Sequence, residues 1–277
     1  MSYFGFLALF LGIPLAILSL VTIADYRRNK WSPASLAAFP AWKVILGLCA
    51  VAFIYTTPWD NYLVATEVWN YNINLVSGIV FGWVPIEEYT FFILQPIMTA
   101  LFFLLLVRYL PNSSAPANNR SIRFAATFIA VIVFMIFAIF LRLSFLDDAF
   151  KPFTYLSLEL TWALIPIIIQ FAFGADILWR HAKTVILAIA ISTIYLSWAD
   201  SLAISAGTWA ISSEQSLHFL LFGVLPIEEF VFFLITNTLV VFGMTLVLAE
   251  ESQKRALALT QLAIFRPLIK YFHHVTV

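Results

Sequence analysis

The sequence reads Phe81-Gly82-Trp83-Val84-Pro85-Ile86-Glu87-Glu88-Tyr89-Thr90-Phe91-Phe92 and, in its second half, Phe222-Gly223-Val224-Leu225-Pro226-Ile227-Glu228-Glu229-Phe230-Val231-Phe232-Phe233. In both stretches a proline and two glutamates open a long apolar run, a pattern that predicts the first turn of a membrane-spanning helix. Acidic side chains beside hydrocarbon are costly. Two copies of an acidic pair in such a place therefore indicate where the chemistry of this chain lies.

The composition is that of an integral membrane protein. Of 277 residues, 62% are hydrophobic and 11% are charged, whereas a soluble domain of this length needs far more charge to cover its surface. The 15 basic residues balance the 15 acidic residues, which argues against a nucleic-acid partner. The single cysteine, Cys49, lies in an apolar run, so the sequence predicts neither a disulfide framework nor a cysteine metal site.

Seven apolar segments are long enough to cross, or nearly cross, a hydrocarbon layer about 30 Å thick at about 1.5 Å per residue. The predicted spans are approximately 3–24, 41–57, 85–107, 121–143, 153–174, 182–199 and 226–249. We therefore expect an all-α membrane protein with about seven transmembrane helices. Two shorter apolar stretches, 73–84 and 217–225, precede the acidic motifs, and either dip into the membrane as re-entrant segments or lie flat at its surface.

Positive charge alternates between the connections of these spans. The loops 58–84 and 200–225 contain neither Lys nor Arg, whereas Lys and Arg cluster after the first, third, fifth and seventh spans. By the positive-inside rule, the N-terminus is predicted outside and the C-terminus in the cytoplasm of a multi-pass protein of the cell membrane. The connection that carries Arg142 and Lys151 departs from this pattern, although two aspartates accompany its cations.

The second half of the chain repeats the first. The matched positions include Lys43 and Lys183, Tyr55 and Tyr195, Asp60 and Asp200, Trp69 and Trp209, the two acidic motifs, and, in the first helices, Tyr3 and Tyr155 with Pro14 and Pro166. We predict one repeat at 1–108, a linker with the fourth span at 109–150, a second repeat at 151–249 and a cytoplasmic tail at 250–277.

The unmatched fourth span sets the orientation of the repeats. A unit with three crossings inverts on repetition unless one more helix intervenes, and the span 121–143 supplies that helix. The two three-helix repeats are therefore predicted to be parallel and related by a pseudo-twofold axis along the membrane normal, which places both acidic pairs at equivalent depths.

The acidic pairs have a structural and a chemical interpretation. A proline followed by glutamates is a favourable helix start, because its fixed φ suits the first turn and carboxylates favour the positive end of the helix dipole. Other residues can also cap a helix, so two identical motifs favour chemistry, although duplication alone can preserve them. We take Glu87, Glu88, Glu228 and Glu229 as candidate catalytic residues. Adjacent residues on a helix lie about 100° apart, so one member of each pair is expected to face the bundle.

Three further acidic residues lie in or beside the spans. Asp60 and Asp200 match between the repeats, and each is expected either to orient a catalytic glutamate or to cap a loop. Glu159 has no counterpart in the first repeat, and a site role and a hydrogen-bonded structural role are equally compatible with its position. Two neighbouring carboxyl groups in a low-dielectric site can supply an acid and a base together.

These residues resemble the lycopene cyclase domain of the heterodimeric bacterial, archaeal and fungal type of lycopene β-cyclase, a family of small membrane proteins marked by P-x-E-[ED] motifs. The resemblance is carried by Thr57-Pro58-Trp59-Asp60-Asn61-Tyr62, by Trp69 and by the first acidic motif, and it recurs more loosely from Trp198 to Phe233. It covers nearly the whole chain. The copies differ, because Ala199 stands at the position of Trp59 and Ser201 at that of Asn61.

The resemblance implies an enzyme of carotenoid biosynthesis, which converts the ψ-ends of lycopene into β-rings by way of monocyclic γ-carotene. The family reaction is redox-neutral: a proton adds to the terminal alkene, the neighbouring double bond captures the cation, and a proton is lost. Paired carboxyl groups can provide the acid and the base. Carbocations need a dry, aromatic pocket. The residues expected to line it are Trp69, Tyr89, Phe91, Phe92, Trp209, Phe230, Phe232 and Phe233.

The sequence predicts no dinucleotide cofactor, because no G-x-G-x-x-G occurs among its nine glycines, and it predicts no metal site. The expected partners are the carotenoid substrates and membrane lipid, with other carotenoid enzymes as candidates.

Two other classes of seven-helix membrane protein are alternatives to this one. A retinal photoreceptor needs a lysine in its last helix, and the span 226–249 has none. A proton-coupled transporter would use carboxylate pairs at a repeat interface, and it stays open as the alternative function. It predicts polar residues on several helices, whereas the second, fourth and sixth spans are almost wholly apolar.

Overall fold

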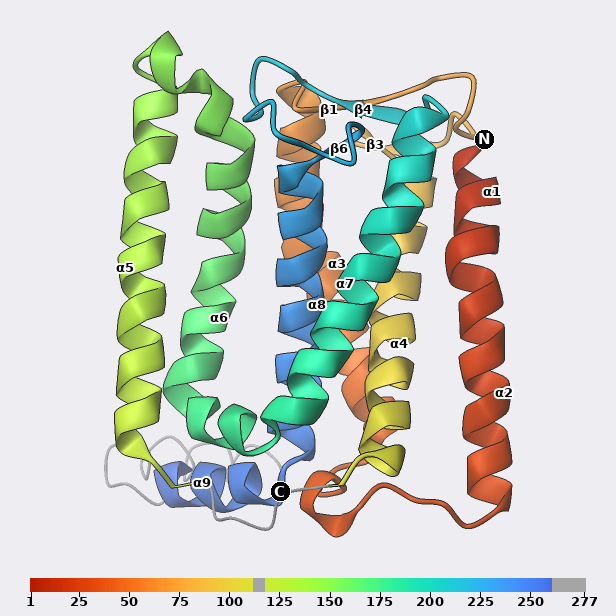
Figure 1. Cartoon of the computed structure of the whole chain (residues 1–277), viewed down its shortest axis with the longest axis vertical. Helices are drawn as coiled ribbons and strands as arrows, with labels where there is room; N and C mark the ends of the chain where they lie inside the picture. The colour runs from red at the N-terminus through yellow and green to blue at the C-terminus, as the bar shows by residue number, and fades with distance from the viewer. Residues whose placement is uncertain (112–117, 261–277) are drawn as a thin grey trace, which may run out of the picture.

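The computed structural model describes residues 1–111 and 118–260. Within them, seven helices are long and apolar enough to cross a membrane, and they stand side by side as one bundle (Figure 1). This confirms the predicted all-α membrane fold. The predicted tail at 250–277 falls partly outside the described residues, which end at Thr260.

The bundle helices follow the predicted spans, with differences at their ends. They are α1 (Tyr3–Leu7), π-helical η1 (Ala8–Gly12) and α2 (Ile13–Arg27), which together form the first span, then α3 (Ala41–Ala65), α4 (Ile86–Tyr109), α5 (Arg120–Ser144), α6 (Thr154–Arg180), α7 (Ala182–Ser205) and α8 (Ile227–Leu248). The 3₁₀ turns η2 (Ala34–Leu36) and η3 (Asp148–Phe153) precede α3 and α6, and α9 (Glu250–Thr260) lies across one end of the bundle (Figure 1).

Helices α3 and α7 run past the predicted ends of their spans. α3 continues through Pro58 to Ala65, because a membrane helix tolerates the one backbone hydrogen bond that a proline removes. α7, which contains no proline, continues past its predicted end at residue 199 to Ser205. Asp60 and Asp200 therefore lie inside helices, which excludes the loop-capping interpretation of these two residues.

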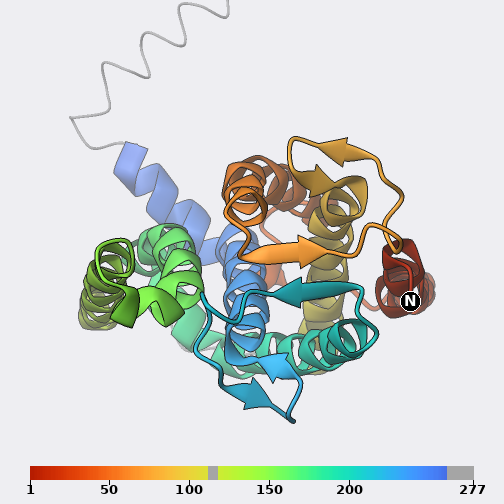
Figure 2. The same ribbon diagram turned by 90° about the horizontal axis from the view of Figure 1, so that it is seen from above.

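The short apolar stretches before the acidic motifs lie flat and form strands. β2 (Val80–Phe81) pairs with β3 (Val84–Pro85), and β5 (Leu220–Leu221) pairs with β6 (Leu225–Pro226), each as a hairpin directly before an acidic helix. Both hairpins lie across the end of the bundle that holds the N-terminus (Figures 1 and 2). Of the two predicted arrangements, the re-entrant one is wrong, because each segment turns back within a few residues and forms a hairpin at the end of the bundle.

A third antiparallel pair joins the two halves of the chain. β1 (Trp69–Tyr71) lies beside β4 (Trp209–Ile211), with Asn70 opposite Ala210 (Figure 2). Asn70 and Ala210 are matched positions of the predicted repeats, so the centre of this pair coincides with the predicted pseudo-twofold axis.

Backbone hydrogen bonds recur at matched positions. The N–H of Tyr3 donates to the carbonyl of Leu75 at 2.8 Å, and the N–H of Tyr155 donates to the carbonyl of Gln215 at 3.0 Å. Each bond fixes the start of a first helix to the loop before an acidic motif. This recurrence supports the predicted repeat. Helix α5, which contains the unmatched fourth span, packs on α6 at the edge of the bundle (Figure 2).

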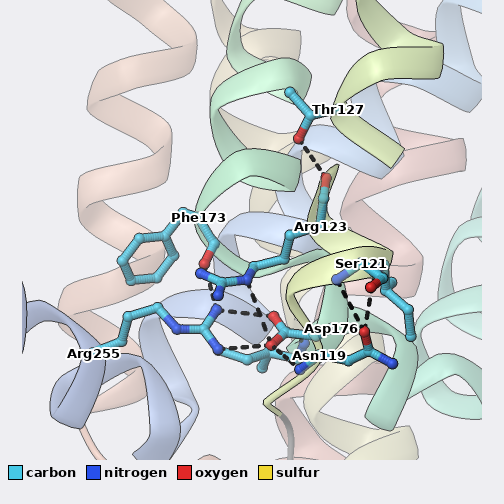
Figure 3. Close-up of polar contacts among 9 residues, drawn as sticks. Asn119, Ser121, Arg123, Thr127, Phe173, Asp176 and Arg255 are labelled. Atoms are coloured by element: carbon cyan, nitrogen blue, oxygen red, sulfur yellow. Dashed lines mark hydrogen bonds and ion pairs between the residues drawn. The ribbon is translucent and has the colours of Figure 1, made fainter. Parts of the chain in front are cut away.

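Buried ion pairs hold the end of the bundle opposite the hairpins. The guanidinium of Arg255 on α9 donates to Asp176 on α6 at 2.8 and 2.9 Å, and Arg123 of α5 approaches the same carboxylate at 3.7 Å (Figure 3). Arg108 on α4 donates to Asp25 on α2 at 2.8 Å. The basic residues predicted to face the cytoplasm thus serve here to connect helices.

The two glycines after β2 and β5 provide a matched test of the hairpins. Gly82 has a φ of +66°, and a Cβ placed on it would lie 2.2 Å from Oδ1 of Asn61, which accepts from the N–H of Trp83 at 2.8 Å. Gly223 has a φ of +73°, but nothing lies within 4 Å of its Cβ position.

We predict that Gly82→Ala destabilises the protein more than Gly223→Ala does. Both substitutions incur the left-handed backbone cost of about 1–2 kcal/mol, and only Gly82→Ala adds the loss of the Asn61 hydrogen bonds, about 1–3 kcal/mol. Thermal unfolding of the two variants in the same detergent measures the difference. Equal melting temperatures would show that Asn61 does not hold the first hairpin.

Candidate functional site

A cavity below the β1–β4 pair brings the two acidic motifs together. Its walls are formed by Tyr3, Phe6, Trp69, Tyr71, Glu88, Phe91, Asp200, Trp209, Ile211, Glu229, Phe232 and Phe233. One acidic residue comes from the first turn of α4 and one from the first turn of α8, because the hairpins start both helices at the same end of the bundle. The free volume is about 30 Å³, so the cavity as it stands holds little more than a water molecule.

Glu88 is held by two tyrosines. The hydroxyl of Tyr3, on α1, donates a short hydrogen bond to Oε2 of Glu88, and the hydroxyl of Tyr71, on β1, donates to the same oxygen at 3.0 Å. Partial burial and the nearby Glu88 carboxyl raise the pKa of Tyr71 well above its usual value. The Tyr71 phenol therefore keeps its proton at neutral pH and remains a donor.

Glu229 has two partners, Tyr155 and Asp200. The hydroxyl of Tyr155 donates to its Oε1 at 2.7 Å, as Tyr3 donates to Glu88. Asp200 lies within hydrogen-bonding reach of Glu229 and accepts at Oδ1 from the indole N–H of Trp209 at 2.8 Å. Two carboxyl groups can bond to each other only when one of them carries a proton.

Two further carboxyl groups lie behind this wall. Asp60 is fully buried on α3 and interacts electrostatically with Glu88. Glu159 is fully buried on α6 beside Tyr155 and Glu229. Among the described residues, Asp60 has no hydrogen-bond donor to its carboxyl oxygens, whereas Glu159 lies within hydrogen-bonding reach of the hydroxyl of Tyr155. Both interpretations of Glu159, as a site residue and as a hydrogen-bonded structural residue, therefore stay open.

The other glutamate of each motif faces its hairpin. Oε1 of Glu87 accepts from the N–H of Ser77 at 2.5 Å, and Oε1 of Glu228 accepts from the N–H of Leu217 at 2.7 Å. Both side chains are fully buried. One member of each pair thus enters the shared cavity and its neighbour fixes the loop above, an arrangement that the 100° angle between adjacent helical residues allows.

The predicted aromatic residues divide into three groups. Trp69, Phe91, Trp209, Phe232 and Phe233 line the cavity, whereas Phe92 lines an adjoining groove. Tyr89 and Phe230 are not among the residues that line either space. Tyr89 instead donates from its hydroxyl to the carbonyl of Phe81 at 2.9 Å, because its position after Glu88 turns it toward the first hairpin.

Sequence reasoning missed the tyrosines of the site. Tyr3 and Tyr155 were matched between the repeats, and each lies far from its acidic motif in sequence, so the alignment alone carried the signal. Tyr71 has Ile211 as its counterpart and gave no signal. The two halves of the site are therefore unequal: Tyr71 adds a donor beside Glu88, and Glu159 adds a carboxyl group beside Glu229.

The arrangement is suited to moving protons in a dry, aromatic space. Proton donors and acceptors from both halves line one small cavity, and the electron-rich faces of its aromatic rings can stabilise a positive charge. Phe232 and Phe233 lie with ring centroids 5.3 Å apart, and Phe91 lies 6.3 Å from Phe233.

Comparison with known proteins finds similar chains in archaea and fungi. The chain is 34% identical over 245 residues to a lycopene beta-cyclase of Halobacterium salinarum, and this match covers 88% of the chain and 95% of that protein. It is 37% identical over 207 residues to a bifunctional lycopene cyclase/phytoene synthase of Podospora anserina, and 35% identical over 199 residues to one of Phycomyces blakesleeanus. These matches cover 71% of the chain but only 34% and 32% of the fungal proteins, so the chain spans about a third of their length. No protein-family model and no solved structure matches the chain.

The division of each acidic pair predicts opposite effects on stability. Glu87→Gln is expected to lower the free energy of unfolding by about 1 kcal/mol, because the glutamine amide offers the N–H of Ser77 a single acceptor oxygen in place of the two of a carboxyl group. Glu229→Gln is expected to leave stability unchanged or to raise it, because it removes one of several crowded acidic groups. Thermal unfolding of both variants tests this, and a larger loss for Glu229→Gln would contradict the assignment.

Proposed function

The chain belongs to the family of lycopene β-cyclases, and from this membership we propose that it converts the acyclic ends of lycopene into β-rings in carotenoid biosynthesis. The observation that supports this most strongly is the meeting of Glu88 and Glu229 in one aromatic cavity. The comparisons give no support to the alternative of a proton-coupled transporter.

In the proposed mechanism, the pair Glu229 and Asp200 delivers the proton. These two carboxyl groups line the cavity within hydrogen-bonding reach of each other, so a bond between them requires that one of them carries a proton. That proton adds to the terminal carbon–carbon double bond of the substrate, and the electron pair of the alkene forms the new C–H bond. Glu159 stands next to this pair as a further proton-binding group.

Ring closure and loss of a proton follow beside the same acidic groups. The π electrons of the neighbouring double bond attack the cation and form the C–C bond that closes the ring. The positive charge moves to the other carbon of that double bond. Loss of a proton to Glu88 restores a double bond. Tyr3 and Tyr71 each donate a hydrogen bond to Oε2 of Glu88 and so hold this carboxyl group at the cavity wall, where it acts as the base.

The aromatic wall protects and stabilises the cation in this proposal. Water would capture a carbocation, and the small cavity has room for little more than one water molecule. The faces of Phe91, Phe232 and Phe233 offer the negative quadrupole that favours a nearby positive charge. No atoms are gained or lost overall, so the reaction requires no electron acceptor, and we propose that the enzyme acts without a flavin or nicotinamide.

The substrates and the membrane follow from the same proposal. Cyclisation of one end gives monocyclic γ-carotene, which is the substrate for the second ring, and both carotenoids dissolve in lipid. The chain is a multi-pass membrane protein. We propose that its hairpin end faces the outside of the cell membrane, because the basic residues Arg108, Arg123 and Arg255 gather at the opposite end.

We predict that the purified protein converts lycopene to γ-carotene and then to β-carotene under anaerobic conditions after removal of small cofactors. Chromatography of the extracted pigments measures the conversion. A preparation that makes no rings until reduced flavin is added would overturn the proposed cofactor independence.

We predict that Glu88→Gln and Glu229→Gln each lower the rate of cyclisation by at least about a hundredfold, the lower range for loss of a general acid or base. Glu87→Gln and Glu228→Gln are the matched controls from the same motifs, and they are expected to keep most of the activity. All four variants are compared at equal amounts in the membrane of a lycopene-accumulating host. The opposite pattern, with activity lost only in the two controls, would place the chemistry at the hairpins.

A further inference from the structure

A groove adjoins the carboxylate cavity between α3, α4, α6 and α8. Its volume is about 180 Å³, six times that of the cavity, and its walls are almost entirely apolar, with Leu48, Ala52, Pro166 and Leu239 among them. On α3 the lining extends from Leu48 to Thr56, which corresponds to about 12 Å at the rise of an α-helix. The groove is thus a narrow slot that runs along the bundle axis.

The groove adjoins the site at one end and the lipid-facing surface on one side. Phe91 and Phe232 line both the groove and the carboxylate cavity. An open hollow of about 510 Å³ on the outer surface shares Val51, Tyr55 and Trp162 with the groove. Val51 is 61% exposed on the face of the bundle that lipid would cover. The hollow, the groove and the cavity therefore lie in series between the surface at α3 and α6 and the acidic groups, and they define a path between the two.

Two aromatic side chains stand across this path. The hydroxyl of Tyr55 on α3 donates to the carbonyl of Trp162 on α6 at 2.8 Å, and the two rings stack with centroids 5.4 Å apart. Trp162 also stacks on Trp59, at 4.6 Å. This hydrogen bond and these ring contacts connect α3 to α6.

The matched groove on the other half of the bundle does not reach the site. It has a volume of about 290 Å³, and Ile191, Ser192, Tyr195 and Met98 line it at positions matched to those of the first groove, but it shares no lining residue with the carboxylate cavity. Phe10 lies on the helix between the two spaces, with its ring packed edge-on against Trp198 at 5.7 Å.

We propose that the groove between α3 and α6 binds the conjugated polyene of the acyclic carotenoid, which comes from the lipid past Tyr55 and Trp162 with its terminal alkene directed to Phe91 and Phe232. This inference rests on the proposed function. The carboxylate cavity is too small for an end group, so the end lies in the groove and only its terminal carbons reach the acids. Because one groove leads to one cavity, the two ends of lycopene react in separate binding events and γ-carotene is released between them.

Matched substitutions in the two grooves test the proposal. Ala52→Phe and Leu239→Phe narrow the groove that reaches the site, whereas Ser192→Phe and Met98→Phe are the same changes at the matched positions of the other groove. We expect the first pair to slow lycopene consumption by about tenfold or more, in line with steric exclusion from an apolar pocket. The second pair is expected to stay within about twofold of the unsubstituted protein. The activities are compared at equal amounts of protein in the membrane, and the melting temperature of each variant shows whether it folds. Two variants per groove keep the test valid if one of them fails to fold.

A binding measurement separates this inference from the proposed function. In Glu229→Gln protein, lycopene binding is followed by quenching of tryptophan fluorescence, and Ala52→Phe is expected to weaken binding by about tenfold, whereas Ser192→Phe is not. If the unsubstituted protein makes no rings, but Ala52→Phe still weakens lycopene binding, the proposed function is overturned and the groove is supported. Normal cyclisation and binding in both narrowed variants, or equal losses in both grooves, would overturn the groove.

Discussion

The structure depends on seven buried carboxyl groups at one end of an apolar bundle: Asp60, Glu87, Glu88, Glu159, Asp200, Glu228 and Glu229. Buried acids require hydrogen-bond partners. In the contacts that the described residues make, the partners of five of these groups are phenols, an indole and backbone N–H groups rather than cations; the five are Glu87, Glu88, Asp200, Glu228 and Glu229. The elements at this end supply them: α1 brings Tyr3, β1 brings Tyr71, β4 brings Trp209, and the segments before the hairpins bring two backbone amides.

The helical part of this fold could be predicted from composition and pattern, and the connections could not. Apolar length defined seven spans, which the structure confirms. The hairpins have strands of two residues, too short to show an alternating pattern, and both apolar stretches could equally have been re-entrant. The extension of α3 past Pro58 was missed because proline usually marks a helix end in a soluble protein.

The site was predictable in its acids and less so in what surrounds them. Repetition identified the glutamates and both aspartates, and helical geometry allowed one glutamate of each pair to face inward. It could not say which one, because that depends on where the hairpins place the first turn. Tyr71 and Glu159 break the internal symmetry, so no repeat could reveal them. That asymmetry agrees with a site in which Glu88 and Glu229 have different roles and only one groove delivers substrate.

The most direct test of the central claim is the deuterium content of the product after a single turnover by enzyme equilibrated in D₂O. If exchangeable protons held by Glu229 and Asp200 start the reaction, γ-carotene should carry one deuterium in its ring, since the proton that is added stays and a different one is lost. A product without deuterium, formed at a normal rate, would contradict the account, because ring closure would then not begin with a proton from these side chains.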